Sequence, residues 1–279
     1  MLESDKNVAG AIVKVKPVVP DNSLHPWQER YYRNGPDYRF NSDVSFTDIQ
    51  VQFGFATIRL GRWVDPIEQQ LAANLIFDAL ADLSFMLNVP PLVIGLRGSL
   101  HLAFGTDGNR DAKAHYQPGK RTLALAKNAG GGALAHEFWH AFDHYIRSHL
   151  YPQSRCLLAS DAWLNEQDYA HHPLNDALIA IFDTALLSSD KRGPSEYLAR
   201  AIALDKKSNH YYFSQPTEAL ARAFEAFIQD GSIGNNFLVS GTQKSKLAQV
   251  GGYPPPHLRA QLNDKFTCYF HLLGHALQQ

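Results

Sequence analysis

Residues 130–145 read GGGALAHEFWHAFDHY and contain the pattern H-E-x-x-H at His136, Glu137 and His140. Two histidines four residues apart on a helix lie about 40° apart around its axis, so both side chains can reach one metal ion. Glu137 lies beside them and can act as a general base. A catalytic zinc usually has three protein ligands and keeps a fourth position for water. The pattern supplies two ligands, and the third must come from elsewhere in the chain.

The residues around the motif predict a helix with one apolar and one polar side. A helical wheel separates the two kinds of residue, with Leu134, Phe138, Phe142 and Tyr145 on one side and His136, Glu137, His140 and Asp143 on the other. A buried polar seam costs free energy unless a ligand or partner satisfies it. A solvated helix face is the alternative, and the bulky Trp139 disfavours it. Asp143, one turn beyond His140, suits a hydrogen bond to a histidine better than a bond to the metal.

The residues alone leave the third ligand open. Two groups of zinc enzymes place it six residues after the second histidine, as His or Asp, but Ile146 stands there. A glutamate from a separate helix remains, which is the arrangement of the glutamate zincins. His144, on the rim of the same face, is an alternative ligand or a hydrogen-bond donor to one. The downstream candidates are Glu166, Glu196, Glu218 and Glu225.

The composition is that of an ordinary globular protein. Of the 279 residues, 45% are apolar and 19% are charged, and 26 Lys and Arg nearly balance 27 Asp and Glu. The basic residues are scattered, so the sequence gives no strong signal for nucleic acid or for an anionic membrane. Two cysteines, Cys156 and Cys268, exclude a disulfide scaffold and a cysteine-rich zinc module.

The N-terminal residues and the length of the apolar runs indicate where in the cell the protein is expected. The N-terminal residues include acids where a signal peptide needs a basic region. No run reaches the roughly 18 apolar residues of a membrane helix. We therefore expect a cytoplasmic protein with no membrane association.

Hydrophobic periodicity predicts strands before the motif and mainly helices after it, which is an α+β pattern. Strands are predicted at 46–60, 92–104, 114–116 and 122–127. Helices are predicted from Pro66 to about Asn88, at 133–149, and around 173–187, 194–205, 216–229 and 256–277.

The predicted elements form one domain over residues 46–279. Residues 1–45 are rich in Pro, Asn, Asp and Arg, and we interpret them as an extended arm packed on the body through Trp27, Tyr31, Tyr32 and Tyr38. We expect the 122–127 strand to border the cleft beside the motif helix. An exposed strand there would offer its backbone N–H and C=O groups to an extended peptide.

A resemblance points to one third ligand. The block EALARAF, which starts at Glu218 and follows a segment with tyrosines, resembles the third-ligand helix of lethal-factor-like metallopeptidases, whose HEF-H helix also continues into an Asp. It implies that Glu218 is the zinc ligand and that Tyr211, seven residues earlier, helps to stabilise an oxyanion. Arg222 stands where those proteins have an acidic residue. Tyr212 and His210 remain alternatives to Tyr211, because side chains alternate along an extended segment.

A wider resemblance covers nearly the whole chain. Segments such as RNGPDYRF, FGFATIRLGRWV and IGLRGSLHLAFG are similar to the bacterial CLCA_X family. The part from about 93 to 228 is similar to a zincin-like domain of large polyvalent phage and plasmid proteins. These resemblances imply a zincin-like metallopeptidase domain, with a small mixed sheet packed on the HExxH helix and a helical C-terminal half.

These observations predict a zinc metallopeptidase that acts on a peptide or protein substrate. Zn²⁺ would polarise the carbonyl and lower the pKa of water, and Glu137 would take the proton. The alternative is a zinc-binding interaction module with the same fold and no turnover. Glu137 favours the enzyme, because folding and metal binding need only the ligands.

Overall fold

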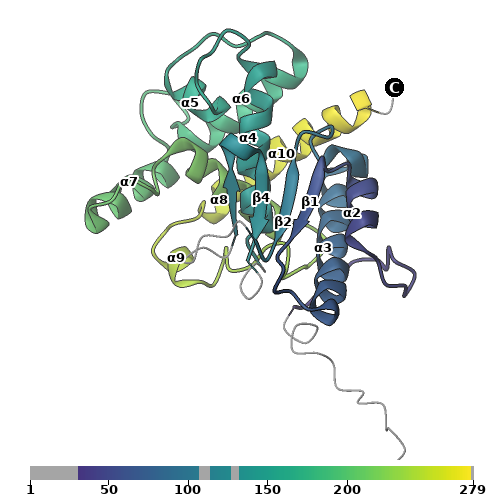
Figure 1. Cartoon of the computed structure of the whole chain (residues 1–279). Helices are drawn as coiled ribbons and strands as arrows, with labels where there is room; N and C mark the ends of the chain where they lie inside the picture. The colour runs from purple at the N-terminus through teal and green to yellow at the C-terminus, as the bar shows by residue number, and fades with distance from the viewer. Residues whose placement is uncertain (1–30, 107–113, 127–131, 278–279) are drawn as a thin grey trace, which may run out of the picture.

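The computed structural model describes residues 31–106, 114–126 and 132–277 of the chain. A mixed four-stranded sheet has the order β1-β2-β4-β3, with β1, β2 and β4 parallel and β3 antiparallel to β4 (Figure 1). The predicted α+β class, with a small mixed sheet and mostly helical structure, is confirmed. The strands are β1 (Thr57–Leu60), β2 (His101–Phe104), β3 (Ala114–Gln117) and β4 (Thr122–Leu125).

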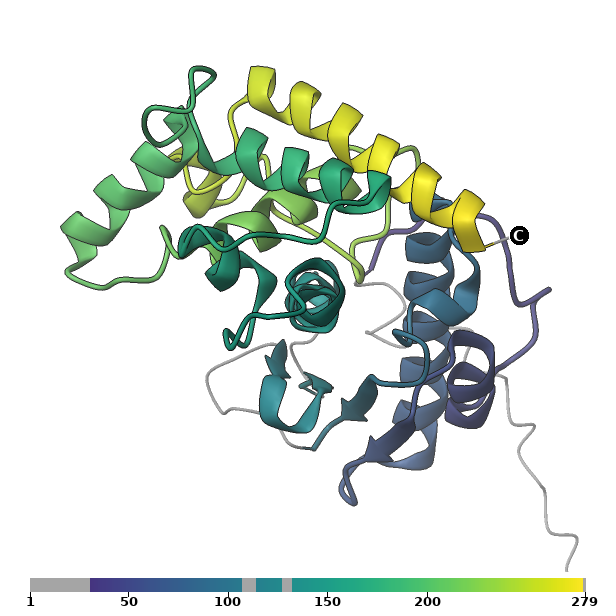
Figure 2. The same ribbon diagram turned by 90° about the horizontal axis from the view of Figure 1, so that it is seen from above.

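Helices follow the motif in the predicted order and within a few residues of the predicted bounds. α4 lies between the sheet and a layer that contains α6, α8 and α10, and it is seen end-on in Figure 2. The helices are α2 (Phe46–Phe53), α3 (Pro66–Leu87), α4 (Leu134–Leu150), α5 (Ala159–Leu164), α6 (Pro173–Leu186), α7 (Glu196–Ser208), α8 (Pro216–Gln229), α9 (Lys246–Gln249) and α10 (Pro256–Leu277), with short 3₁₀ helices at Pro91–Val93 and Pro118–Lys120.

The strand predicted at 46–60 is wrong for its first half, which forms α2. The apolar residues there alternate in sequence, but the buried ones are Ile49 and Phe53, which are four residues apart, whereas Val51 is 72% exposed. The burial period is therefore that of a helix. Ser45 caps the helix in a capping box, a local signal that outweighs the short alternation. In the 92–104 prediction, likewise, only the last four residues form a strand.

The expectation of an exposed strand at 122–127 is also wrong. β4 is buried along its whole length and pairs with β2 on one side and β3 on the other. The chain turns at Pro118–Lys120, so β4 runs back between β3 and β2 and leaves β3 on the outer side. α4 packs against both strands. Within the described part of the sheet, the edge beside α4 therefore belongs to β3.

α3 is the long apolar helix of the N-terminal half. Its caps are as predicted, with Asp65 accepting a hydrogen bond from the Glu68 N–H, Pro66 in the first turn and Asn88 in the left-handed conformation at the end. Its length and composition would allow it to span a membrane, but 61% of its apolar window is buried inside the protein. α3 therefore serves as a core helix in this fold.

Residues 31–45 lie along α3 and are held mainly by ion pairs. Arg33 Nε is 2.7 Å from Asp82 Oδ2, and Arg39 Nε is 2.9 Å from Asp78 Oδ1. Tyr31 packs edge-on against Phe237, with ring centroids 5.1 Å apart. Trp27 and the rest of the predicted arm up to residue 30 lie outside the described residues. The division into an arm over 1–45 and one domain over 46–279 stays a prediction.

Candidate metal centre

The start of α4 is tied to the segment before α9. No side chain caps this helix; instead the Gly132 N–H donates to Phe237 O at 2.7 Å and the Ala135 N–H to Leu238 O at 3.1 Å. Gly132 has a φ of +88°, and a Cβ atom there would lie 2.3 Å from Ser240 Oγ. Only glycine fits this close approach without strain. These contacts fix the position of the first turn of α4, which carries the motif.

An aromatic cluster fixes α4 against α8 and α10. The Trp139 ring is fully buried, and its centroid lies 5.0 Å from Phe224 on α8 and 5.4 Å from Phe266 on α10. Aromatic pairs at these separations add to the free energy gained by burial. The adjoining face of α4, with His136 and His140, therefore faces the first turns of α8.

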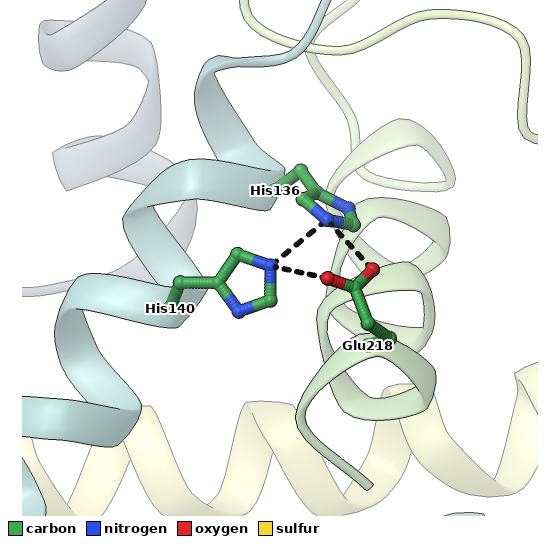
Figure 3. A group of neighbouring side chains, drawn as sticks. All are labelled: His136, His140 and Glu218. Carbon is green, nitrogen blue, oxygen red and sulfur yellow. Dashed lines mark hydrogen bonds and ion pairs between the residues drawn. The ribbon is translucent and has the colours of Figure 1, made fainter. Parts of the chain in front are cut away.

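Three predicted side chains meet between these helices (Figure 3). His136 Nε2 lies 3.0 Å from His140 Nε2. Glu218 points both oxygens at the pair, with Oε2 3.4 Å from His136 Nε2 and Oε1 3.3 Å from His140 Nε2. The structure therefore brings together the residues that the sequence proposes as ligands, from two helices far apart in the chain.

The donor set fits a zinc ion. Bonds of about 2.0–2.2 Å in a tetrahedral site place neighbouring ligand atoms about 3.3–3.6 Å apart. The three distances here, 3.0, 3.3 and 3.4 Å, are close to that range. Two imidazoles and one carboxylate are also a usual protein set for catalytic zinc. Two other candidates lie elsewhere, since Glu166 is exposed and Glu196 pairs with Arg200.

Glu225, the last candidate ligand, has a different position. Its Oε2 lies 3.0 Å from His136 Nδ1, the ring nitrogen that does not face Glu218. The Tyr253 hydroxyl donates to the same oxygen at 3.3 Å. A proton on Nδ1 that donates to Glu225 leaves the lone pair on Nε2 of His136 for a metal ion. Glu225 therefore orients a ligand rather than joining the ligand set.

His140 has a matching arrangement on the other side. Its Nδ1 lies 3.0 Å from Thr217 Oγ1, and the Thr217 hydroxyl in turn bonds to Asp143. Asp143 is fully buried and accepts from the Ser160 N–H at 2.9 Å and the Ser160 hydroxyl at 2.6 Å. Burial raises the pKa of Asp143 despite these hydrogen bonds. Asp143 thus supports a histidine, as predicted, but through Thr217.

Thr217→Val removes the hydrogen bond to His140 at nearly constant volume. We expect the variant to fold and to bind zinc about 10- to 100-fold more weakly, which is the usual cost of losing such a partner. Competition with a chromophoric chelator measures the affinity. Thr184→Val is the matched control, because the Thr184 hydroxyl bonds only to Ala180 O within its own helix. Equal zinc affinity in Thr217→Val and Thr184→Val would contradict this role.

The charges at the centre favour a cation. Burial lowers the pKa of His136, but hydrogen bonds to Glu218 and Glu225 outweigh it and raise the pKa to about 10. Burial raises the pKa of Glu218, but the two histidines more than offset it and hold the pKa well below its usual range. Positive charge is thus stabilised here even without a metal. A metal ion needs neutral imidazoles, so its binding would displace this proton.

Glu137 is buried, at 9% exposed, and its side chain makes no hydrogen bond or ion pair within the described residues. It lies in the first turn of α4, and its charge contributes to the raised pKa of His136. A buried carboxylate without a partner costs free energy unless it has a task or a ligand. The position and the unoccupied lone pairs are those that a general base requires.

Arg222 stands where the resembling proteins have an acid, and it contacts the third candidate ligand. The side chain is 2% exposed, with Nη1 3.4 Å from Glu218 Oε2. It also donates to Phe213 O. Arg222 therefore holds the Glu218 carboxylate, while Glu225 supplies the acidic partner of the first histidine.

The structure separates the two tyrosines before α8. Tyr211 is 61% exposed, whereas Tyr212 is 39% exposed and lies near enough to Glu218 for that carboxylate to act on its hydroxyl. Burial and this carboxylate raise the pKa of Tyr212. The oxyanion role that the resemblance gives to Tyr211 therefore fits Tyr212, its neighbour in a segment of alternating side chains. The role itself remains a prediction for either residue.

Asp205 at the end of α7 holds the segment that carries Tyr212. Its carboxylate accepts hydrogen bonds from the backbone N–H groups of Tyr212 at 3.1 Å, Phe213 at 2.7 Å and Ser214 at 2.8 Å. Burial raises the pKa of Asp205, but these bonds outweigh it and lower the pKa below its usual value. The backbone of Tyr212 is thus fixed in front of α8.

His144, the alternative ligand, lies away from the three, as do two histidines on strands. His144 Nδ1 is 2.7 Å from the Tyr116 hydroxyl, and His115 Nε2 is 2.7 Å from Gln117 Nε2. His101 Nδ1 is 2.8 Å from Thr57 Oγ1. In the described parts of the chain, these three therefore have side-chain partners outside the metal centre.

Sequence reasoning missed two residues around the centre, Thr217 and Tyr253. Thr217 directly precedes Glu218, so a hydroxyl beside a candidate ligand in the first turn of a helix was a usable signal. Tyr253 lies in the turn before α10, and no sequence pattern connects it to Glu225.

Comparison with known proteins gives one partial match. Residues 204–277 match large polyvalent protein-associated domain 1, or LPD1. This segment runs from the end of α7 through α10 and includes Glu218, whereas the motif on α4 lies outside it. The predicted link to large polyvalent proteins is confirmed for this segment, although the sequence placed it at about 93–228. No match was found among curated proteins. The resemblances to CLCA_X and to zincins stay predictions.

Proposed function

We propose that the protein is a zinc-dependent metallopeptidase with a zincin-like fold, in which H-E-x-x-H on α4 and a glutamate on α8 hold the metal. The observation that carries this proposal is the convergence of His136, His140 and Glu218 beside the buried Glu137, whose side chain has no partner among the described residues. A module that only binds zinc needs the three ligands. A buried glutamate without a partner beside them is better explained by catalysis.

Each residue then has a task. When bound, zinc supplies a Lewis acid that polarises the substrate carbonyl and lowers the pKa of water. Glu137 accepts the proton of the attacking water and delivers it to the departing amine nitrogen. The Tyr212 hydroxyl donates a hydrogen bond to the carbonyl oxygen as negative charge develops on that oxygen. Glu225 and Thr217 keep the two imidazoles oriented throughout.

The edge of the sheet supports a peptide as the substrate. β3 runs beside α4, and in the described sheet its outer side has no strand partner. Such an edge can pair with an extended chain through backbone hydrogen bonds, whatever the side chains of that chain. The proposed substrate is therefore an extended segment of a peptide or protein that lies along β3.

Tyr212→Phe should keep zinc and fold but lower kcat by about 10²-fold or more with little change in KM, because a donor to the oxyanion acts mainly in the transition state. Steady-state kinetics on one peptide substrate measures both constants. Tyr211→Phe is the matched control and should have wild-type kinetics. Full activity in Tyr212→Phe, or the loss in Tyr211→Phe instead, would show that the hydroxyl of Tyr212 does not have this task.

The proposed reaction is tested by a cleavage profile on a peptide library. The wild-type protein loaded with one zinc is compared with chelator-treated protein and with Glu137→Gln. Cleavage at defined bonds that needs both zinc and Glu137 supports the enzyme. Zinc binding with identical, uncleaved profiles for the wild type and Glu137→Gln would favour the interaction module instead.

A further inference from the structure

A second polar hollow lies beside the later turns of α4, away from the metal ligands. It encloses about 150 Å³ between α4, the turn before β2, and the hairpin that joins β3 to β4. None of the three candidate zinc ligands lines it. The polar residues in its wall are Ser99, Tyr116, Arg121, His144, Arg147 and Ser148.

Among the described residues, the hollow carries positive charge that no acid offsets. Neither Arg121 nor Arg147 forms an ion pair with a carboxylate among the described residues. Burial lowers the pKa of His144, and both arginines lower it further, with no acidic group acting in the other direction. Two guanidinium groups that act on one imidazole without a counter-ion form a local anion-attracting field.

Arg147 has a donor without a partner. Its Nε is buried and makes no hydrogen bond, and its Nη1 has only a 3.4 Å contact with Ser154 O. A buried donor on a charged group costs free energy unless an acceptor reaches it. The described part of the chain offers Nε no acceptor, so an anion beside the Arg147 guanidinium would offset part of this cost through its charge.

Tyr116 and His144 add neutral donors. Burial raises the pKa of Tyr116, although Arg121 opposes this, so the hydroxyl keeps its proton. It lies 2.7 Å from His144 Nδ1 and donates to that nitrogen when the ring is neutral. The other ring nitrogen then carries a proton to donate. The wall thus contains charged and neutral donors and no acid.

We propose that this hollow binds one phosphate-sized oxyanion, as free phosphate or as the phosphoryl group of a small molecule. Its volume of about 150 Å³ is well above the roughly 15 Å³ of such space that one water molecule needs, so one tetrahedral oxyanion fits there. Two guanidinium groups match the several oxygens of phosphate better than the two of a carboxylate. The site is separate from the proposed zinc centre and does not depend on the proposed reaction.

The test uses the full chain and isothermal titration with inorganic phosphate at constant ionic strength. The wild type should show one saturable site and a phosphate-dependent rise in Tm, and Arg121→Gln should weaken binding at least about tenfold. Arg121 is exposed, so its loss leaves the fold intact, whereas Arg147→Gln is a second variant whose fold is checked by circular dichroism. Arg62→Gln is the control, an exposed arginine after β1 at the other end of the parallel strands.

The outcomes are distinct. Competition by glycerol 3-phosphate identifies a phosphoryl site, and binding of inorganic phosphate alone identifies a free-ion site. Unchanged binding in His136→Ala would separate the hollow from the zinc centre, so this proposal survives a failure of the proposed enzyme. No saturable binding in the wild type, equal binding in Arg121→Gln and Arg62→Gln, or loss of binding in His136→Ala would overturn it.

Discussion

Glu137→Gln is expected to lower peptide hydrolysis by about 10²- to 10⁴-fold while zinc content and fold remain those of the wild type. The amide keeps the size of the side chain but cannot accept a proton from water. The Glu137 carboxylate makes no hydrogen bond or ion pair with the rest of the described chain, so its replacement by an amide breaks no such bond. The kcat of one cleaved peptide, with zinc content from metal analysis of the same sample, measures the effect.

Glu166→Gln is the matched control for this variant. Glu166 is exposed and distant in sequence from both helices of the centre, so the same chemical change should leave kcat unaltered. Wild-type kcat in Glu137→Gln would contradict the catalytic role of Glu137. If that sample still bound one zinc ion per chain, the metal centre would remain supported and the proposed chemistry would not.

His136→Ala and Glu218→Ala should each abolish binding of the single zinc ion. Each removes one of three ligands, and binding of an ion at 1,000 times its Kd stabilises a fold by about 4 kcal/mol. For a chain of this size that corresponds to a zinc-dependent rise in Tm of about 10 °C, which both variants should lose. Metal analysis and thermal unfolding with and without zinc measure the two effects.

His171→Ala controls for the loss of a histidine, because the His171 side chain is 82% exposed and contacts Asp176 and Tyr169, which lie outside the metal centre. It should keep both the zinc and the rise in Tm. Unchanged zinc content in both His136→Ala and Glu218→Ala would end the proposed metal centre. Retention in Glu218→Ala alone would contradict Glu218 as the third ligand.

Helix ends were predictable because their signals are local. Asp65, Pro66 and Asn88 bound α3 where the sequence places them, and Pro216 opens α8. Each signal depends on hydrogen bonds within a few residues, so no knowledge of the tertiary structure is needed. The helices after the motif were therefore predicted with little error.

The strands depend on contacts between residues that are far apart in the sequence, and they were predicted less well. Residues 46–53 are too short a stretch for an apolar alternation to distinguish a strand from a helix that buries Ile49 and Phe53. The sequence also does not state which strand forms the edge. The edge position depends on the turn at Pro118–Lys120, after which β4 pairs with β2 and leaves β3 at the edge.

The residues of the candidate site also differ in how far the sequence predicts them, because some share one helix and others come together only in the folded chain. His136, Glu137 and His140 share one helix, so their spacing alone predicts that they can act together. Glu218 lies on another helix, where periodicity alone favours a solvated acid, and only the resemblance selects it as a ligand. The partners Glu225 and Thr217 depend on how α4 crosses α8, which the aromatic cluster around Trp139 sets. No local pattern encodes that crossing.

X-ray diffraction at the zinc absorption edge, from crystals of the native chain grown with zinc, tests the central claim most directly. The proposed centre predicts one anomalous peak per chain, about 2.0–2.2 Å from Nε2 of His136, Nε2 of His140 and a carboxylate oxygen of Glu218. A peak bound by other residues, or no peak between α4 and α8 at saturating zinc, would contradict it.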